Sequence, residues 1–393
     1  MKTGKNLNVV ISCSTKFHAF AMAEQFERLG YLHTFYTTFA SFKNTFFAKF
    51  VSRLDKENIE VTRIKTNLLL AILHKLFSNY PHIWNELFDR WVAFKLKHNS
   101  DFDVFIGWSG MSLHSIRQAK KMGKTTIVER GSSHIVYQNE ILKEEYAKFG
   151  IPFSIHSSVI AKELKEYDEA DYISIPSTFV KNSFSDKGVN KDKIIQNPYG
   201  VELRNFYSKR DVVGVSTPIK ILYLGNLSFR KGLPYLFEAI NSLSNEKFNF
   251  EVHFIGTISP DFQNYFNQNK NPNWIMHGHI PQHELKNELP NFDMAIHPSL
   301  EEGLSMVISQ LLACGVPVIA TTNTGGEELI QEGYNGYIVP IRNSEAIKEK
   351  IELLLNDTNK LIAMKLNAIE SVKDGFTWNH YGNRWQENIE KII

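Results

Sequence analysis

Short, wholly apolar runs alternate with amphipathic helical runs along most of this 393-residue sequence. Strands that are apolar throughout are typical of parallel sheets covered by helices on both faces. The alternation therefore predicts an α/β protein of the doubly wound type. The first half contains the predicted strands NVVISCS, HTFYTT, DVFIGWSG, TTIVER and DYISIPS, with helical patterns over residues 18–30 and 157–170.

The pattern starts again after residues 197–218, where prolines and glycines indicate a linker. A second series of apolar runs follows, namely IKILYLGN, FEVHFIGT, NWIMHGH, DMAIHPS, PVIATTN and GYIVP. A chain of this length usually forms more than one core. We therefore predict two doubly wound domains that meet near residue 200. Ligands of such sheets bind beyond the carboxyl ends of the strands, so the two facing domains should enclose a cleft.

Composition excludes several classes of protein. The net charge of +2 gives no sign of nucleic-acid binding. Cys13 and Cys314 lie far apart, which indicates reduced thiols in a cytoplasmic protein rather than a disulfide framework. The first residues are interpreted as a strand, not as a signal peptide, and no run reaches the roughly 18 apolar residues of a membrane span.

Residues 297–326, HPSLEEGLSMVISQLLACGVPVIATTNTGG, combine a strand end, two glutamates and a short helix. Ser305 is the expected N-cap of this helix, and Gly315 is its expected stop. The free N–H groups and partial positive charge at the start of the helix should point into the cleft. That arrangement suits a phosphate or a diphosphate.

A basic turn follows the first predicted strand of the second domain, in the run LYLGNLSFRKGLPYLFEAI. Arg230 offers a planar fork for phosphate oxygens, Lys231 offers a movable charge, and Gly232 lets the backbone bend. A solvated basic turn is the alternative interpretation. Both this turn and the glutamate segment lie at carboxyl ends of strands in one sheet, so they are expected to converge on one anion.

These segments together resemble the retaining GT-B glycosyltransferases of family 4. The hallmark of that family is two glutamates separated by seven residues, followed by a helix, a CG-P-VI strand and a glycine turn, as in EGLSMVISQLLACGVPVIATTNTGG. The resemblance extends over most of residues 170–340, whereas the N-terminal half matches only loosely. It implies a GT-B fold with an acceptor-binding domain (1–200), a nucleotide-sugar-binding domain (201–375) and a terminal helix (376–393) that crosses back.

The resemblance also implies an activity, namely retaining transfer of a sugar from a nucleotide diphosphate-sugar to a hydroxyl group. The implied acceptor is a glycan or a lipid-linked sugar in bacterial surface polysaccharide synthesis. No cofactor and no metal ion are expected. Asp101 and Asp103 imitate a metal-binding Asp-x-Asp motif, but they precede their strand and so lie at the wrong end of the sheet.

Carried over by position, Glu302 matches the first family glutamate, beside the donor sugar, and Gln310 matches the second, which holds the ribose. An amide can accept from and donate to a hydroxyl, although it lacks the charge-assisted bond of a carboxylate. Lys231 matches the phosphate-binding lysine, and Arg230 is expected to replace the arginine that the family often has where Asn226 stands. The expected donor-binding residues are Asn226, Gly278, Gly303, Leu304, Ser305, Met306 and Gln310. Glu328 matches an acidic residue after the last core strand, or serves as a helix-start carboxylate.

On the acceptor side, the resemblance points to the loop after the first strand and to a Gly-Ser loop after TTIVER. The family commonly has two glycines before a histidine in the first loop, whereas this chain has Cys13 and Ser14 before His18. Ser14, His18 and Arg130 are the expected acceptor-side residues, with pairing to a local carboxylate as the alternative for Arg130. His134 is the candidate for the catalytic histidine that contacts the transferred sugar, beside Arg230, Lys231 and Glu302.

Three alternatives remain open. Residues 42–56 place phenylalanines beside a basic stripe, which is typical of a helix on an anionic membrane surface or of a helix packed on its own domain. The first case would make the protein peripheral on the inner face of the membrane. A nucleotide-sugar epimerase of the same architecture could use Glu302 and His134 in proton transfer. A degenerate, non-catalytic sugar-nucleotide-binding subunit would account for Gln310, Asn226 and the missing glycines.

Overall fold

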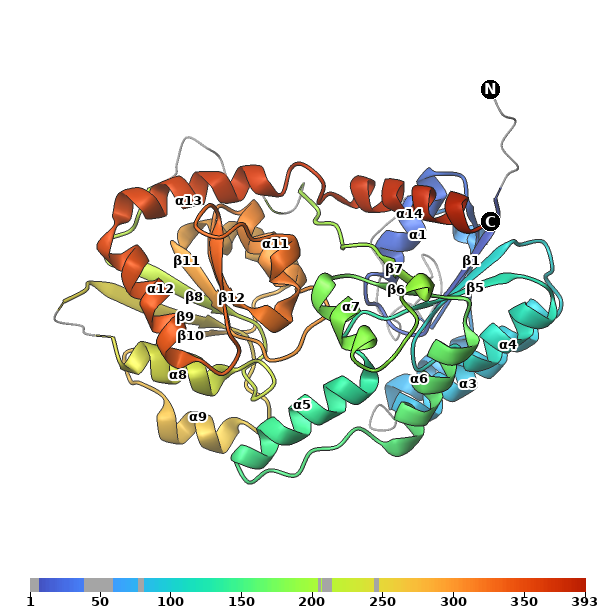
Figure 1. The fold of residues 1–393 in the computed structure, drawn as a ribbon, viewed down its shortest axis with the longest axis horizontal. Helices are drawn as coiled ribbons and strands as arrows, with labels where there is room; N and C mark the ends of the chain where they lie inside the picture. The colour runs from blue at the N-terminus through green and yellow to red at the C-terminus, as the bar shows by residue number, and fades with distance from the viewer. Residues whose placement is uncertain (1–6, 39–58, 77–80, 204–205, 207–213, 244–246) are drawn as a thin grey trace.

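The computed structural model describes residues 7–38, 59–76, 81–203, 206, 214–243 and 247–393. Residues 42–56, which carry the expected membrane helix, lie outside this part. The described residues form two parallel sheets with helices packed around them, and the two units lie side by side along the long axis of the molecule (Figure 1). The prediction of two doubly wound domains is therefore confirmed.

The N-terminal sheet has seven strands in the order β3-β2-β1-β4-β5-β6-β7, all paired in parallel. Its central strands, such as β1 and β4, are buried along their whole length, which is why they read as continuous apolar runs. The edge strands β3 and β7 were not predicted, because three residues carry too little pattern. The strands are β1 (Val9–Cys13), β2 (Leu32–Thr37), β3 (Ile64–Thr66), β4 (Val104–Trp108), β5 (Thr125–Glu129), β6 (Tyr172–Ile175) and β7 (Ile194–Gln196).

The helices of the N-terminal domain follow the predicted alternation with the strands. The two helical patterns named in the sequence correspond to α1 and α6. The helices are α1 (Ala19–Arg28), α2 (Leu68–Leu76), α3 (Pro81–Leu96), α4 (Leu113–Lys121), α5 (Ile135–Lys148), α6 (Ser157–Glu169) and α7 (Thr178–Ser185).

The C-terminal sheet has six parallel strands in the order β10-β9-β8-β11-β12-β13. Each of the six apolar runs predicted in the second half forms one of them. The strands are β8 (Ile219–Leu224), β9 (Phe250–Ile255), β10 (Ile275–Gly278), β11 (Met294–His297), β12 (Val318–Thr321) and β13 (Gly336–Val339). The helices are α8 (Leu233–Asn241), α9 (Gln263–Asn269), α10 (Gln282–Glu288), α11 (Met306–Ala313), α12 (Ser344–Asn356) and α13 (Thr358–Ser371).

The last helix, α14 (Trp378–Ile392), leaves the C-terminal domain and packs on α1 (Figure 1). Its fully buried Trp385 lies against Phe26 of α1, with 5.8 Å between the ring centroids. The guanidinium of Arg28 donates a hydrogen bond of 2.8 Å to the Asn383 side chain. By the order of the described elements, the chain passes from the N-terminal to the C-terminal domain between β7 and β8 and returns before α14.

Helix α5 belongs to the N-terminal domain by topology, but its far end is packed on the C-terminal domain (Figure 1). Phe149, directly after α5, stacks on Phe229 with 4.4 Å between the ring centroids. The buried carboxylate of Glu145 accepts hydrogen bonds from Arg342 (2.7 Å) and from the hydroxyl of Tyr235 (2.8 Å). Phe229 directly precedes Arg230 and Lys231. The end of α5 thus supports the turn that carries the two cations.

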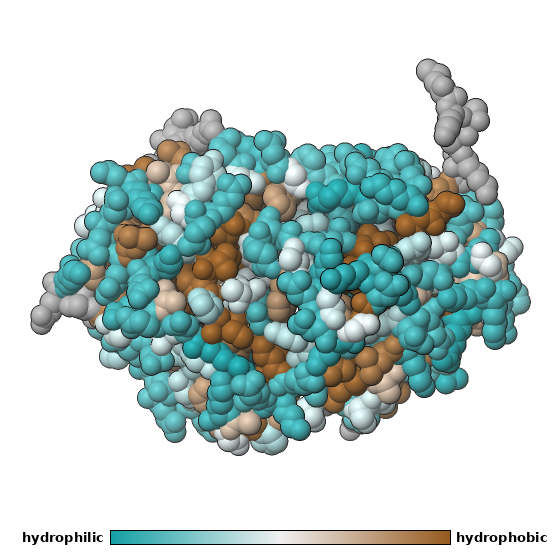
Figure 2. Space-filling view, in the orientation of Figure 1, coloured by the Kyte–Doolittle hydropathy of each residue, from teal (hydrophilic) through white to brown (hydrophobic). Residues whose placement is uncertain are grey.

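Figure 2 shows one face of the molecule as mainly hydrophilic, with apolar residues gathered in separate patches. Within the described ranges, none of the helices combines the length and the apolar character that a membrane crossing needs.

Candidate functional site

The turn after β8 and the glutamate segment after β11 meet in the folded chain. The Glu302 carboxylate forms an ion pair with the Lys231 ammonium and lies 3.3 Å from the Arg230 guanidinium. Burial alone would raise the pKa of Glu302, but the charges of Arg230 and Lys231 outweigh it and lower that pKa to about 2. Glu302 is therefore ionised at neutral pH, and the expected convergence of the two segments is present.

Backbone contacts hold this turn against the glutamate segment. The N–H of Leu300 donates to the carbonyl of Arg230 (2.9 Å), and the Arg230 guanidinium donates to the carbonyl of Glu301 (2.6 Å). Gly232 adopts a positive φ of 67°, and a Cβ at this position would clash with the carbonyl oxygen of Pro298. A glycine is thus required here, because its backbone has a left-handed φ and also touches the neighbouring loop.

The start of α11 forms the third part of the candidate site. Ser305 is the N-cap of α11, as predicted, although its hydroxyl makes no capping hydrogen bond. The backbone N–H groups of Met306 and Val307 have no acceptor among the described residues. Unpaired N–H groups at a helix start favour an anion, so this helix start is a candidate part of a phosphate site.

Gln310 lies on α11, and only 8% of its surface is exposed. Its side-chain amide makes no hydrogen bond to any other residue that the structure describes. A buried amide normally has a partner, because an unpaired polar group costs free energy. The Gln310 amide thus lacks a partner in the described part of the chain, and its contact with a ribose stays a prediction.

The remaining predicted donor-side residues lie around this centre. Asn226 follows β8, donates to the Ser259 hydroxyl (2.6 Å) and accepts from Thr257 (3.2 Å), so it links the loops after β8 and β9. Gly278 ends β10, and its carbonyl accepts from the N–H of Gly256 (2.8 Å). Leu304 is buried next to Gly325, and Gly303 touches the other domain.

Two loops from opposite domains touch at Gly303. A Cβ added to Gly303 would clash with the carbonyl oxygen of Gly131, which follows β5 of the N-terminal domain. The hydroxyl of Ser177 also donates to the carbonyl of Gly303 (2.6 Å). The carboxyl ends of the two sheets are therefore in direct contact beside Glu302.

Gly303→Ala is accordingly expected to lower the free energy of unfolding by about 1–3 kcal/mol, because the added methyl group forces the two backbones apart. Chemical denaturation would measure this difference. Gly214→Ala is the matched control, since a Cβ at Gly214 would meet no atom within 4 Å. Equal unfolding midpoints for Gly303→Ala and the parent would contradict the tight approach of the two loops.

On the N-terminal side, His18 lies close to this contact. Its ring bonds to the buried carboxylate of Glu129 (3.0 Å) and packs on Tyr199, with 4.1 Å between the centroids. A Cβ added to Gly131 would lie 3.8 Å from the His18 ring. Ser14 is buried, and its hydroxyl donates to the Asn85 side chain (2.8 Å). Ser14 is thus engaged within its own domain.

Arg130 and His134 are both held inside the N-terminal domain. Arg130 pairs with Glu163 at 2.8 Å, and both side chains are almost fully buried. Of the two predicted roles for Arg130, pairing with a local carboxylate is therefore the one observed.

His134 caps α5 by accepting from the N–H of Val136 (3.3 Å), and its ring packs against Tyr167 and Phe184. Burial and the nearby Arg130 lower the pKa of His134 to about 4. The structure gives this neutral ring a capping role, and a contact with the transferred sugar stays a prediction.

Carboxylates of the C-terminal domain bind backbone groups of the N-terminal domain, which the sequence did not predict. Glu327 accepts from the N–H of Phe179 (2.8 Å), and Glu328 accepts from the N–H of Thr178 (2.6 Å), both at the start of α7. The Glu328 carboxylate thus lies at the start of α7, a helix of the other domain. Glu301 is fully buried and accepts four hydrogen bonds from the N-terminal domain. From the sequence, a role in the site was predicted for Glu302 but not for Glu301.

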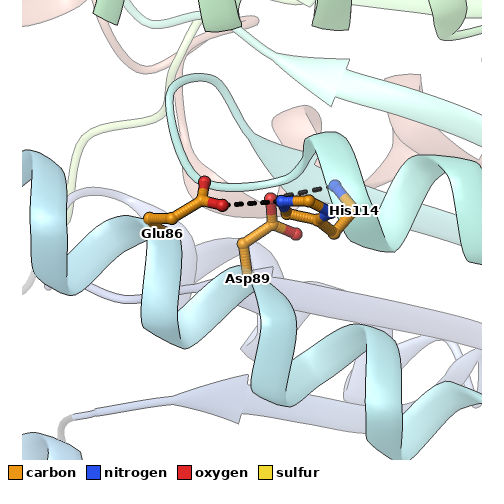
Figure 3. Close-up of side chains that lie close together, drawn as sticks. All are labelled: Glu86, Asp89 and His114. Carbon is orange, nitrogen blue, oxygen red and sulfur yellow. Dashed lines mark hydrogen bonds and ion pairs between the residues drawn. The ribbon is translucent and has the colours of Figure 1, made fainter. Parts of the chain in front are cut away.

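One cluster of possible metal ligands lies away from the cleft, between α3 and α4 (Figure 3). The Glu86 carboxylate bonds to the His114 ring (2.7 Å), and Asp89 accepts from the backbone N–H of His114 (2.9 Å). Lys162 lies 2.8 Å from Glu86 and 2.9 Å from Asp89. The carboxylates of Glu86 and Asp89 already bind the Lys162 ammonium, and Asp89 also accepts from the N–H of His114 near the start of α4. This set of side chains therefore does not fit an added metal ion.

Comparisons with known proteins show which proteins this chain is similar to. Residues 207–371 match the family of glycosyl transferases group 1. An Escherichia coli protein named as a putative colanic acid biosynthesis glycosyltransferase, WcaL, is 27% identical over 199 residues, which cover 48% of this chain and 49% of that protein. The chain therefore spans about half the length of that relative.

Two further similarities extend over most of the chain. An uncharacterized glycosyltransferase of Methanocaldococcus jannaschii is 25% identical over 342 residues, which cover 81% of this chain and 83% of that protein. The crystal structure of Anabaena HepE in complex with UDP has a TM-score of 0.69 and 14% identity, with 98% of this chain and 100% of that chain covered. The predicted GT-B fold is confirmed by this likeness.

Proposed function

We propose that this protein is a glycosyltransferase that uses a nucleotide diphosphate-sugar, because residues 207–371 match the family of glycosyl transferases group 1. It would transfer the sugar, with retention of its configuration, to a hydroxyl group of a glycan or lipid-linked acceptor. Polysaccharide biosynthesis is the proposed setting, since the relatives include proteins named for colanic acid and capsular polysaccharide synthesis.

One observation carries the proposal: two cations and a free helix start converge beside Glu302. Arg230, Lys231 and the unpaired N–H groups of Met306 and Val307 all lie in the segments that follow β8 and β11. Breaking a sugar–diphosphate bond builds negative charge on the departing diphosphate. Fixed positive groups aimed at that charge stabilise the transition state more than the ground state.

The proposed reaction needs no carboxylate nucleophile. The bond between the sugar carbon and the diphosphate oxygen breaks, and the acceptor hydroxyl oxygen forms its bond to the same carbon from the same face. The proton of the hydroxyl moves to the departing phosphate oxygen. Glu302 would hold the donor sugar, and Gln310 would hold the ribose. Because the domains touch at Gly303 and Gly131, water would be excluded from this step.

The nucleotide can be identified by a thermal-shift screen with UDP, GDP, ADP and their sugars. The binding nucleotide should raise the melting temperature, because a ligand at 100 times its Kd adds about 2.7 kcal/mol to stability. UDP is the first to test, since the similar HepE structure is a complex with UDP. No response to any nucleotide would contradict the proposal.

Product analysis separates the proposed enzyme from its two alternatives. A transferase releases the nucleoside diphosphate when a glycan acceptor is added. An epimerase instead yields a new sugar isomer, and a non-catalytic subunit binds the nucleotide without turnover. The epimerase has no specific support in the geometry, because the pKa of His134 is about 4 and its ring caps α5.

Transfer is expected to persist in the presence of EDTA. The charge on the leaving diphosphate would be met by Arg230, Lys231 and the start of α11, a role that a magnesium ion plays in other enzymes. Release of the nucleoside diphosphate should be measured after removal of metals and again after addition of magnesium or manganese. A complete loss that either ion restores would contradict the metal-independent mechanism.

A further inference from the structure

The Glu301 carboxylate is buried at the contact between the domains, and its hydrogen-bond donors all come from the other domain. One oxygen accepts from the Ser132 hydroxyl (2.5 Å), the Ser133 N–H (3.0 Å) and the Ser133 hydroxyl (2.7 Å). The second oxygen accepts from the Gln138 amide of α5 (2.9 Å). None of these donors carries a charge, so they satisfy the carboxylate without neutralising it.

The orientation of Gln138 is fixed from within the N-terminal domain. Its carbonyl oxygen accepts from the buried Arg130 (2.9 Å), which leaves its NH₂ group to face Glu301. Arg130 itself is held by Glu163 at 2.8 Å. A continuous polar chain therefore runs from Glu163 through Arg130 and Gln138 to Glu301. Because Arg130 orients the Gln138 amide from within the N-terminal domain, the donor that faces Glu301 is positioned by that domain alone.

On its own side, Glu301 lies next to the turn that carries Arg230 and Lys231. Its second oxygen is 3.6 Å from the Arg230 guanidinium, which also lies 3.3 Å from Glu302. Arg230 and Lys231 thus face two carboxylates, and the four side chains have no net charge. A diphosphate gains little attraction from such a site unless one carboxylate is drawn away from the cations.

We propose that Glu301 is a positioning residue that couples closure of the two domains to the release of Arg230 for the donor diphosphate. When the domains are apart, the N-terminal donors are absent and Arg230 is the cation beside the Glu301 carboxylate. When they meet, Ser132, Ser133 and Gln138 hydrogen-bond to that carboxylate, and Arg230 keeps only a 3.6 Å approach to it, which leaves the guanidinium freer to bind the phosphates. The inference rests on the proposed function, but its structural part can be measured without any turnover.

Two readouts in Glu301→Gln test this coupling. An amide at this position presents an NH₂ group to the NH₂ group of Gln138, so closure should be impaired. The radius of gyration from small-angle X-ray scattering, with saturating UDP or the nucleotide that the thermal screen selects, should exceed that of the parent. Turnover should fall roughly 5- to 150-fold, the usual range of coupling between sites. Nucleotide binding should become tighter, since Arg230 loses a competing carboxylate.

The double variant Glu301→Gln with Gln138→Glu provides the rescue. It exchanges the amide and the carboxylate, so that the new amide at position 301 can donate to the new carboxylate at position 138. Arg130 can still hold the other oxygen of that carboxylate. We expect the radius of gyration to return to the parent value and turnover to recover. Glu349→Gln, on the exposed face of α12, is the control and should change neither quantity.

A Glu301→Gln variant that closes like the parent would overturn the inference, as would a double variant that stays open. Weaker nucleotide binding in the single variant would also contradict it, because Glu301 would then support the donor site directly. A protein that closes as expected but transfers no sugar would leave the coupling intact and refute the proposed function instead.

Discussion

Lys231→Ala is expected to reduce turnover by roughly 10²–10³-fold, the usual effect of removing one preorganised group from a developing negative charge. The loss should appear mainly in kcat, because the lysine is needed most when the diphosphate leaves. The Lys231 side chain is only 14% exposed beside Glu302, so its ammonium acts where water screens charge poorly. Burial also lowers its pKa, although Glu302 opposes that shift.

The same substitution should leave the fold intact, which thermal unfolding would verify. The Lys231 side chain belongs to the ligand end of the sheet rather than to the apolar core. Lys286→Ala is the matched control, since Lys286 is an exposed residue on α10 and should be replaceable without effect. Near-normal turnover in Lys231→Ala would refute the assignment of Lys231 to the leaving group.

Gln310→Leu is expected to weaken nucleotide binding by roughly 1–3 kcal/mol, which is about fivefold to 150-fold in Kd. The physical reason is that a ribose hydroxyl would be left unpaired in a closed site. The loss should be equal for the free nucleoside diphosphate and for the full donor, because both contain the ribose. Gln310→Glu should instead preserve or tighten binding, since a carboxylate accepts hydroxyl bonds more strongly.

Calorimetry on both Gln310 variants decides between a ribose ligand and a packing residue. Gln282→Leu on the exposed face of α10 is the control for a general effect of removing an amide. If Gln310→Leu bound the nucleoside diphosphate as well as the parent, Gln310 would be only a buried residue of α11. A change of Glu302 should behave differently, with its main effect on the donor sugar and on catalysis.

Much of the fold could be predicted because each strand is encoded by a run of consecutive residues. A strand buried on both faces must be apolar at successive positions, so β8, β9, β11 and β12 are visible as runs in the sequence. The three-residue strands β3 and β7 escaped prediction, because so short a run has no period to detect.

The donor side of the site was also within reach of the sequence. Arg230, Lys231 and Glu302 each follow a recognisable strand, and parallel strands bring their carboxyl ends to one edge. Their meeting followed from the sheet order alone. Ser305 was correctly predicted as the N-cap of α11, but the preference for serine at an N-cap does not fix which way its hydroxyl points.

The roles of Glu301, Arg130 and His134 were decided only by the tertiary structure. Nothing in the local sequence distinguishes Glu301, which binds the other domain, from Glu302, which binds two cations. Arg130 had several carboxylates within reach along the chain, and folding selected Glu163. The sequence by itself thus determined the strands, their order of appearance and the residues at their ends, since these depend on neighbours in the chain. The partner of each charge depends on distances of a few ångströms between segments far apart in sequence, and only the packed domains set those distances.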